Sequence, residues 1–123
     1  MVLNQRKNKG GERGPVEIWL EYETDVILAY MSKVHAEDMR FRLIYCTVID
    51  GKKHQVVRYD CCHGFPHKDI CYTTPNRKEK MPKLPNDKLI EMAMHDLKTN
   101  YQAYKQKYLK LTKNENQKNI IPE

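Results

Sequence analysis

Residues that can carry out chemistry are concentrated in one short stretch, "VVRYDCCHGFPHKDICY", residues 56–72. Histidine is the usual general acid or base near neutral pH, and a nearby carboxylate can orient it. The stretch places Asp60, His63, His67 and Asp69 within ten residues. It therefore gathers a potential acid, a potential base and charged orienting groups around what reads as a single turn.

RNA cleavage without a metal ion is one reaction that this set of side chains can support. A base must take a proton from the 2′-hydroxyl, an acid must protonate the leaving oxygen, and a cation must balance the phosphorane. Arg58 can bind a phosphate through two parallel hydrogen bonds. We therefore predict Arg58, Asp60, His63 and His67 as the catalytic residues.

The charge of the chain favours a polyanionic partner such as RNA. The formal net charge is +6, and the Pro-rich connector over residues 73–85 is one of the segments with clustered lysine and arginine. We expect the nucleic acid to be contacted by residues in and after the stretch: Lys68, Tyr72, Arg77, Lys78 and Lys80. The alternative is a lysine-rich surface that only keeps the protein in solution.

A purely structural role for the same stretch stays open. Asp60 can cap the turn and pair with Arg58 along one strand face. His63 can hydrogen-bond to backbone, while Gly64 permits a positive φ and Pro66 fixes the exit from the turn. Under this interpretation the turn is a hydrogen-bonded corner.

The cysteines at positions 46, 61, 62 and 71 are expected to be free thiols, because no secretory signal precedes them. Their spacing contains no C-x2-C pair, so we predict no metal and no cofactor. A zinc-stabilised form, with ligands drawn from Cys61, Cys62, His63, His67 and Cys71, is the lesser alternative. Cys61 as a nucleophile has no accompanying triad signature.

Alternating patterns predict the elements that position the stretch. Strands are expected over residues 16–22, 25–34, 39–49, 53–60 and 68–74, and a helix over 86–111. A helix through 16–34 is the alternative to the first two strands. Asp50-Gly51 between two β-rich runs predicts a hairpin.

Alternation along this hairpin also predicts its two faces. One face is expected to hold Phe41, Leu43, Tyr45, Thr47, Val56, Arg58 and Asp60. The other is expected to hold Arg40, Arg42, Ile44, Cys46, Val48, Gln55, Val57 and Tyr59.

The helix carries an apolar stripe at alternating steps of four and three: Ile90, Met94, Leu97, Tyr101, Tyr104, Tyr108 and Leu111. Packing across a sheet is the preferred interpretation, and a coiled-coil seam is the alternative. The fold class is then α+β, an antiparallel β-meander of about four or five strands packed by a long C-terminal amphipathic helix.

We expect a single domain over residues 15–111, a disordered basic tail over 1–14 and a flexible C-terminal tail over 112–123. No apolar run approaches the roughly 20 residues of a membrane helix, so no membrane partner is predicted. A cytoplasmic location is the expectation.

The motifs "RYD", "HG" and the later "H", followed by a basic segment and the helix containing "HDLKTNYQAY", resemble a group of small prokaryotic proteins similar to the TumE-type toxins of toxin–antitoxin modules. The resemblance covers about residues 38–110 and implies functional positions at Arg58, Asp60, His63, Gly64 and His67. The cysteine pair stands where that pattern usually has Asn after the Asp. It implies a compact sheet-plus-helix protein whose partner is an antitoxin.

The first functional hypothesis is therefore a small basic RNA-targeting protein, toxin-like, acting as a metal-independent endoribonuclease. The second is a non-enzymatic module that binds nucleic acid or protein through the sheet or helix surface. Neither composition nor spacing decides the oligomeric state.

Overall fold

The computed structural model describes residues 2–7, 13–35, 38–61, 65–73, 75–111 and 119–122, and of residues 2–7, 13, 33–35 and 38–39 it describes the backbone alone. Seven strands and a helix follow one another in this described part. They are β1 (Val2–Lys7), β2 (Arg13–Glu21), β3 (Asp25–His35), β4 (Asp38–Ile49), β5 (Lys52–Asp60), β6 (His67–Ile70), β7 (Arg77–Lys80) and α1 (Asn86–Leu111).

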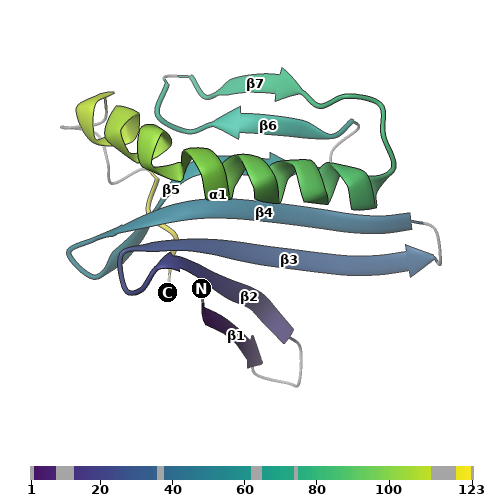
Figure 1. Ribbon diagram of the computed structural model, residues 1–123, viewed down its shortest axis with the longest axis horizontal. Helices are drawn as coiled ribbons and strands as arrows, with labels where there is room; N and C mark the ends of the chain where they lie inside the picture. Colours follow the sequence, from purple (N-terminus) through teal and green to yellow (C-terminus); the bar gives the residue numbers. More distant parts are fainter. Residues whose placement is uncertain are drawn as a thin grey trace.

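The strands form one antiparallel sheet in which each strand pairs with the next along the chain. The helix α1 lies across one side of this sheet (Figure 1). The predicted α+β class is confirmed, and the five predicted strands correspond to β2–β6. The predicted number of strands is too low, because β1 and β7 extend the sheet at its two edges.

The predicted disordered tail over residues 1–14 differs from the structure, in which β1 pairs with β2 along most of its length. The segment has no apolar periodicity that would predict a strand. An edge strand, however, offers a row of unpaired backbone donors and acceptors, and these accept a neighbour of any composition. Residues 2–7 therefore form a strand through backbone pairing with β2, although their side-chain pattern does not predict one.

The predicted hairpin between β4 and β5 is confirmed, but part of its predicted facing is wrong. Asp50 and Gly51 both have positive φ, 52° and 77°, as a two-residue type I′ turn requires. Tyr45 then pairs with Val57, whereas its neighbour Cys46 pairs with Gln55. The extra residue, Val56, forms a β-bulge.

The bulge reverses the predicted facing of the residues that follow it. Arg58 and Asp60 pair with Ile44 and Arg42, so they lie on the side of the sheet opposite α1. Tyr59 instead faces the helix, opposite Leu43. A one-residue shift in register always exchanges the two faces, because side chains alternate with a period of two. We call the side opposite α1 the far face.

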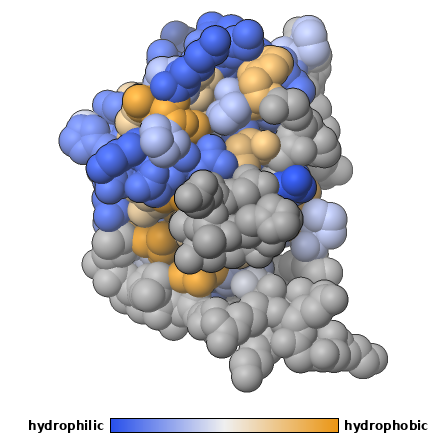
Figure 2. Space-filling view, turned by 90° about the vertical axis from the view of Figure 1, so that its right-hand side faces the viewer, coloured by the Kyte–Doolittle hydropathy of each residue, from blue (hydrophilic) through white to orange (hydrophobic). Residues whose placement is uncertain are grey.

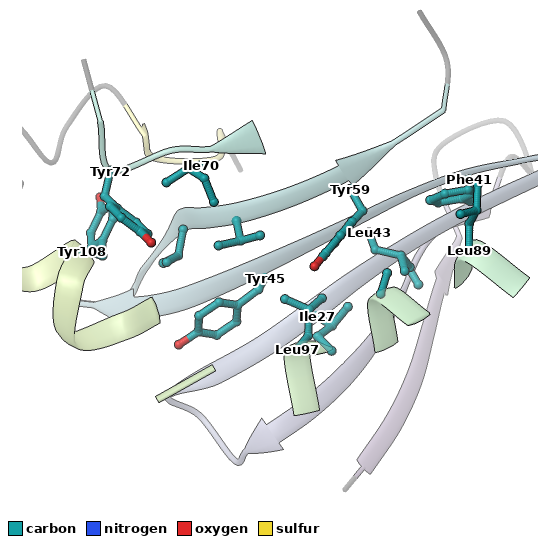
Figure 3. Close-up of a cluster of buried hydrophobic side chains, with 14 residues drawn as sticks. Ile27, Phe41, Leu43, Tyr45, Tyr59, Ile70, Tyr72, Leu89, Leu97 and Tyr108 are labelled. Carbon is teal, nitrogen blue, oxygen red and sulfur yellow. The ribbon is translucent and has the colours of Figure 1, made fainter. Parts of the chain in front are cut away.

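The main core lies between the sheet and α1 (Figure 3). Its largest fully buried side chains include Phe41, Leu43 and Tyr45 from β4. Val56 and Val57 are both fully buried, which explains the bulge: each contributes apolar area to the same core.

The predicted helix begins and ends at the predicted residues, Asn86 and Leu111. The helix packs on the sheet rather than forming a coiled-coil seam, and Leu97 and Tyr108 of the predicted stripe are fully buried. The predicted Ile90 and Met94 are only partly buried, and their neighbours Leu89 and Ala93 are fully buried instead. At the end of the stripe Leu111 is exposed. No helix in the described ranges is both long and apolar enough to cross a membrane.

A smaller apolar cluster on the far face contains Val26, Leu28, Ile44 and Cys46. The predicted flexible tail differs from the structure here, because Ile121 packs on this cluster and its N–H donates to the carbonyl of Lys53 at 2.8 Å. Residues 112–118 lie outside the described residues. Ile120 and Ile121 lie along the edge of β5 at His54 and Lys53, beyond the part of β5 that pairs with the short strand β6.

Candidate functional site

Strand β6 divides the predicted site between the two sides of the sheet. His67 pairs with Asp60 and Asp69 pairs with Arg58, so these four residues share the far face. Lys68, between them in sequence, points to the helix side, where it contacts residues of α1. The structure therefore brings Arg58, Asp60 and His67 together and separates Lys68 from them.

On the far face, Asp69 is the centre of a buried polar network. Its Oδ2 accepts hydrogen bonds from Arg58 Nη2 at 2.7 Å and from Arg58 Nε at 3.2 Å. His67 Nε2 lies 3.4 Å from the same oxygen. The carboxylate is 1% exposed, and Oδ1 has no hydrogen-bond partner in the described part of the chain. Arg58 supplies the charge that makes this burial tolerable.

Asp60 forms a second buried carboxylate on the same face. Arg42 Nε donates to Asp60 Oδ2 at 2.9 Å, with the Asp60 side chain 3% exposed and that of Arg42 39% exposed. In both pairs the carboxylate lies beneath and the guanidinium reaches the surface. A molecule approaching this face therefore meets cations.

The His67 ring is buried, and neighbouring groups lie close to both of its nitrogens. Nδ1 lies 3.1 Å from the Phe65 carbonyl oxygen and Nε2 faces Asp69, with the side chain 5% exposed. A general base has to reach the proton that it removes from the substrate. The second predicted histidine, His63, lies outside the described residues, together with Cys62 and Gly64.

The three described cysteines are free thiols, Cys46, Cys61 and Cys71. Cys61 Sγ lies 3.1 Å from the backbone nitrogen of Phe41, and its own N–H donates to the Phe41 carbonyl at 3.3 Å, so it continues the pairing of β5 with β4. Within the described ranges no group of three His, Cys, Asp or Glu side chains is arranged to hold a metal ion. Cys61 thus has a structural position at the strand end.

The residues predicted to contact nucleic acid also divide between the two sides. Lys78 and Lys80 pair with Asp69 and His67, which places them on the far face. Tyr72 packs in the helix-side core, and Lys68 faces α1. Arg77 forms an exposed ion pair with Glu79 at 3.3 Å, on the helix side of β7.

Sequence reasoning missed four residues that complete the far face. Arg40 and Arg42 on β4 point to the far face, whereas Phe41 between them points to the helix side. The alternation in "MRFR" indicates this arrangement. The exposed aromatic Tyr30 pairs with Arg42, and the exposed Phe65 contacts both the His67 ring and the Lys80 ammonium. We call the five cations Arg40, Arg42, Arg58, Lys78 and Lys80 the basic patch.

A second polar network lies on the helix side and was not expected from the sequence. Asp96 of α1 accepts hydrogen bonds from the hydroxyls of Tyr59 and Tyr104, the latter at 2.7 Å. Asn100 Nδ2 donates to Oδ1 at 2.8 Å. Lys68 Nζ lies 3.4 Å from Asp96 Oδ2 and donates to the Tyr104 hydroxyl at 2.7 Å.

This network shifts the titration of its members. Burial raises the pKa of Asp96, but hydrogen bonds from Tyr59, Tyr104 and Asn100 and the charge of Lys68 outweigh it, so the pKa lies below its ordinary value. Burial, reinforced by Asp96, raises the pKa of Tyr59 and Tyr104. The carboxylate stays ionised and the phenols stay protonated at neutral pH.

The fold and the two networks define a class: an α+β protein with a seven-stranded antiparallel meander, one face of which is covered by a helix and the other basic. Over residues 7–114 the sequence matches the family model described as "Domain of unknown function (DUF7718)", so the chain belongs to this family. No curated protein and no solved structure matches it. The resemblance to TumE-type toxins stays a prediction.

Proposed function

We propose that the protein binds single-stranded RNA through the far face of its sheet. The observation that carries this proposal is the arrangement of charge: five cations of the basic patch reach outward, whereas the carboxylates of Asp60 and Asp69 are 3% and 1% exposed beneath them. Phosphate groups are bound by such outward cations, and each neutralised phosphate releases a counterion.

Two exposed aromatic side chains support RNA over a simple anion. Tyr30 lies beside Arg42 on the neighbouring strand, and Phe65 lies under the Lys80 ammonium, 4.7 Å from its ring centroid. Unpaired bases stack on aromatic rings and on guanidinium planes, and this stacking needs no particular base. A sheet that carries cations and aromatics on one face and a helix on the other suits this mode of binding.

RNA cleavage and an antitoxin partner stay predictions. The described geometry supports binding better than cleavage, because His67 is buried and both of its ring nitrogens lie near protein groups. The binding experiment can report cleavage as well, if the RNA is recovered afterwards and its length is measured by electrophoresis.

The test compares fluorescence anisotropy of labelled oligouridine with wild type and two triple variants. Arg40→Gln/Lys78→Gln/Lys80→Gln removes three cations of the basic patch and leaves both buried carboxylates paired. The matched control removes three exposed lysines of α1, Lys98→Gln/Lys107→Gln/Lys110→Gln, and has the same net charge.

We expect the patch variant to bind about tenfold or more weakly and its salt slope to fall by about 2, since each phosphate contact on a single strand contributes about 0.7. The control should stay within about twofold of wild type, because its charges lie on the helix. Equal losses in the two variants would show that net charge alone attracts the RNA, and the proposal would be abandoned.

A further inference from the structure

We infer that the helix side carries a separate binding site for a small carboxylate with a flat apolar body, in a cavity beside Lys68. The inference goes beyond RNA binding, because the cavity lies against α1 and the basic patch lies on the far face; Lys80 borders the cavity, but its ammonium lies over Phe65. The cavity has a volume of about 300 Å³ and lies between α1 and strands β5–β7. This volume is at the small end of the range for ligand sites.

The polar wall of the cavity presents a donor. Lys68 Nζ has three N–H groups, and within the described chain it contacts two acceptors, Asp96 Oδ2 and the Tyr104 hydroxyl. Asp96 itself is occupied, because two phenols, an amide and this ammonium all direct hydrogens at it. The remaining hydrogen-bonding capacity at this wall is therefore that of a donor, and it suits an anionic acceptor.

Lys68 is also held in place. Its ammonium lies 4.7 Å from the ring centroid of Tyr104 and 5.6 Å from that of Tyr59, and its side chain is 17% exposed. A positioned cation in a partly dry setting binds an anion more strongly than a mobile surface lysine does, because less side-chain freedom is lost.

The apolar part of the lining is formed by Met81, Pro82, Met92 and Ala93. Methionine side chains adapt to the shape of an apolar group and favour contact with aromatic rings. Figure 2 shows hydrophobic surface emerging between hydrophilic residues at the end of the molecule where α1 begins.

Glu79, the other acidic residue of the lining besides Asp96, is paired with Arg77 at 3.3 Å. Lys80 also borders the cavity, but its ammonium lies over the Phe65 ring. Lys68 is therefore the cation that a ligand meets here. A carboxylate at Lys68 with a flat ring against Met92 uses both the polar and the apolar part of the lining, whereas a cationic ligand would face Lys68.

Benzoate is the probe for this site, with benzamide and benzylamine as neutral and cationic matches. We expect benzoate to bind in the millimolar range, as small fragments do, and to shift the methyl resonances of Met81 and Met92 in a ¹H–¹³C spectrum. Lys68→Met should weaken benzoate by about tenfold or more, since a charged hydrogen bond is lost. Lys98→Met, on the exposed surface of α1, should change nothing.

Two variants of opposite charge at Met92, which lines the cavity, test the inference if Lys68→Met does not fold. Met92 is 45% exposed, so both Met92→Lys and Met92→Glu should fold. Relative to wild type, the first should tighten benzoate and the second should weaken it. The inference is wrong if benzylamine binds as tightly as benzoate, if the two Met92 variants bind equally, or if the Met81 and Met92 methyls do not shift. RNA binding is measured separately, and its failure would not affect these outcomes.

Discussion

Two carboxylates on opposite sides of strand β6 show two ways of burying an acid. Asp69, on the far face, has a cation directly across in the neighbouring strand and is 1% exposed. Asp96, on the helix side, is 24% exposed and depends mainly on two phenols and an amide, with Lys68 at a longer distance. The first depends on one opposite charge and the second on several neutral donors.

The two networks should therefore respond differently to the loss of one hydrogen-bonding or charged partner. A buried charge without its counter-charge is costly, because the protein interior cannot solvate it. A carboxylate with several donors keeps most of its stabilisation when one donor is removed. One substitution in the far-face network should therefore cause a large loss in the free energy of unfolding. Each substitution in the helix-side network should cause a smaller loss.

The largest effect is expected from Arg58→Ala. This change leaves the buried Asp69 carboxylate without its charged partner, and we expect a loss of about 3 kcal/mol in the free energy of unfolding. Urea denaturation measures it. The control is Arg77→Ala, whose exposed pair with Glu79 should contribute less than about 1 kcal/mol. A loss below about 1 kcal/mol in Arg58→Ala would mean that the pair does not support the far face.

A smaller effect is expected from Tyr59→Phe. The ring stays in the core and only the hydroxyl that donates to Asp96 is removed (Figure 3). We expect a loss of about 1–2 kcal/mol by urea denaturation, because Asp96 keeps its other donors. Tyr22→Phe, at an exposed ring, serves as the control and should be neutral. A loss as large as that of Arg58→Ala would remove the contrast between the two networks.

The smallest effect is expected in acid. The pKa of Asp96 is lowered in the folded protein from its ordinary value of 3.8, because the hydrogen bonds from the two tyrosines and Asn100 outweigh burial. A lowered folded pKa stabilises the fold above the unfolded pKa, and this contribution is lost as the pH falls from about 4 through the folded value.

Wild type should therefore lose stability below pH 4 more steeply than Asp96→Asn does, as measured by urea denaturation across that range. Asp87→Asn, at an exposed position in the first turn of α1, is the control and should keep the wild-type slope. If the Asp96→Asn slope equals that of wild type, Asp96 is not held in its ionised form by the network.

Local pattern predicted the parts of this structure that depend on local chemistry. Asp50-Gly51 predicted the turn, and the spacing of apolar residues predicted a helix at about 86–111, because both signals lie within a few positions. The bulge at Val56 was not predictable in this way. It depends on Val56 and Val57 both finding space beneath the helix, which is a property of tertiary packing.

Only part of the predicted set of site residues lies together in the structure, and its facing differs from the prediction. Arg58, Asp60 and His67 do come together, but the bulge places them opposite the helix. The Asp96 network joins side chains 37 positions apart, Tyr59 and Asp96, and no local period connects them. Only the docking of α1 on the sheet brings these groups into contact.

The most direct test of RNA binding by the far face is a titration of ¹⁵N-labelled protein with oligouridine, followed by amide chemical shifts. The proposal predicts shifts along β4, β5 and β7 at the residues of the basic patch and at Tyr30 in β3, with α1 unchanged. Shifts confined to the lysines of α1 between Lys98 and Lys110, or no shifts at all, would contradict it.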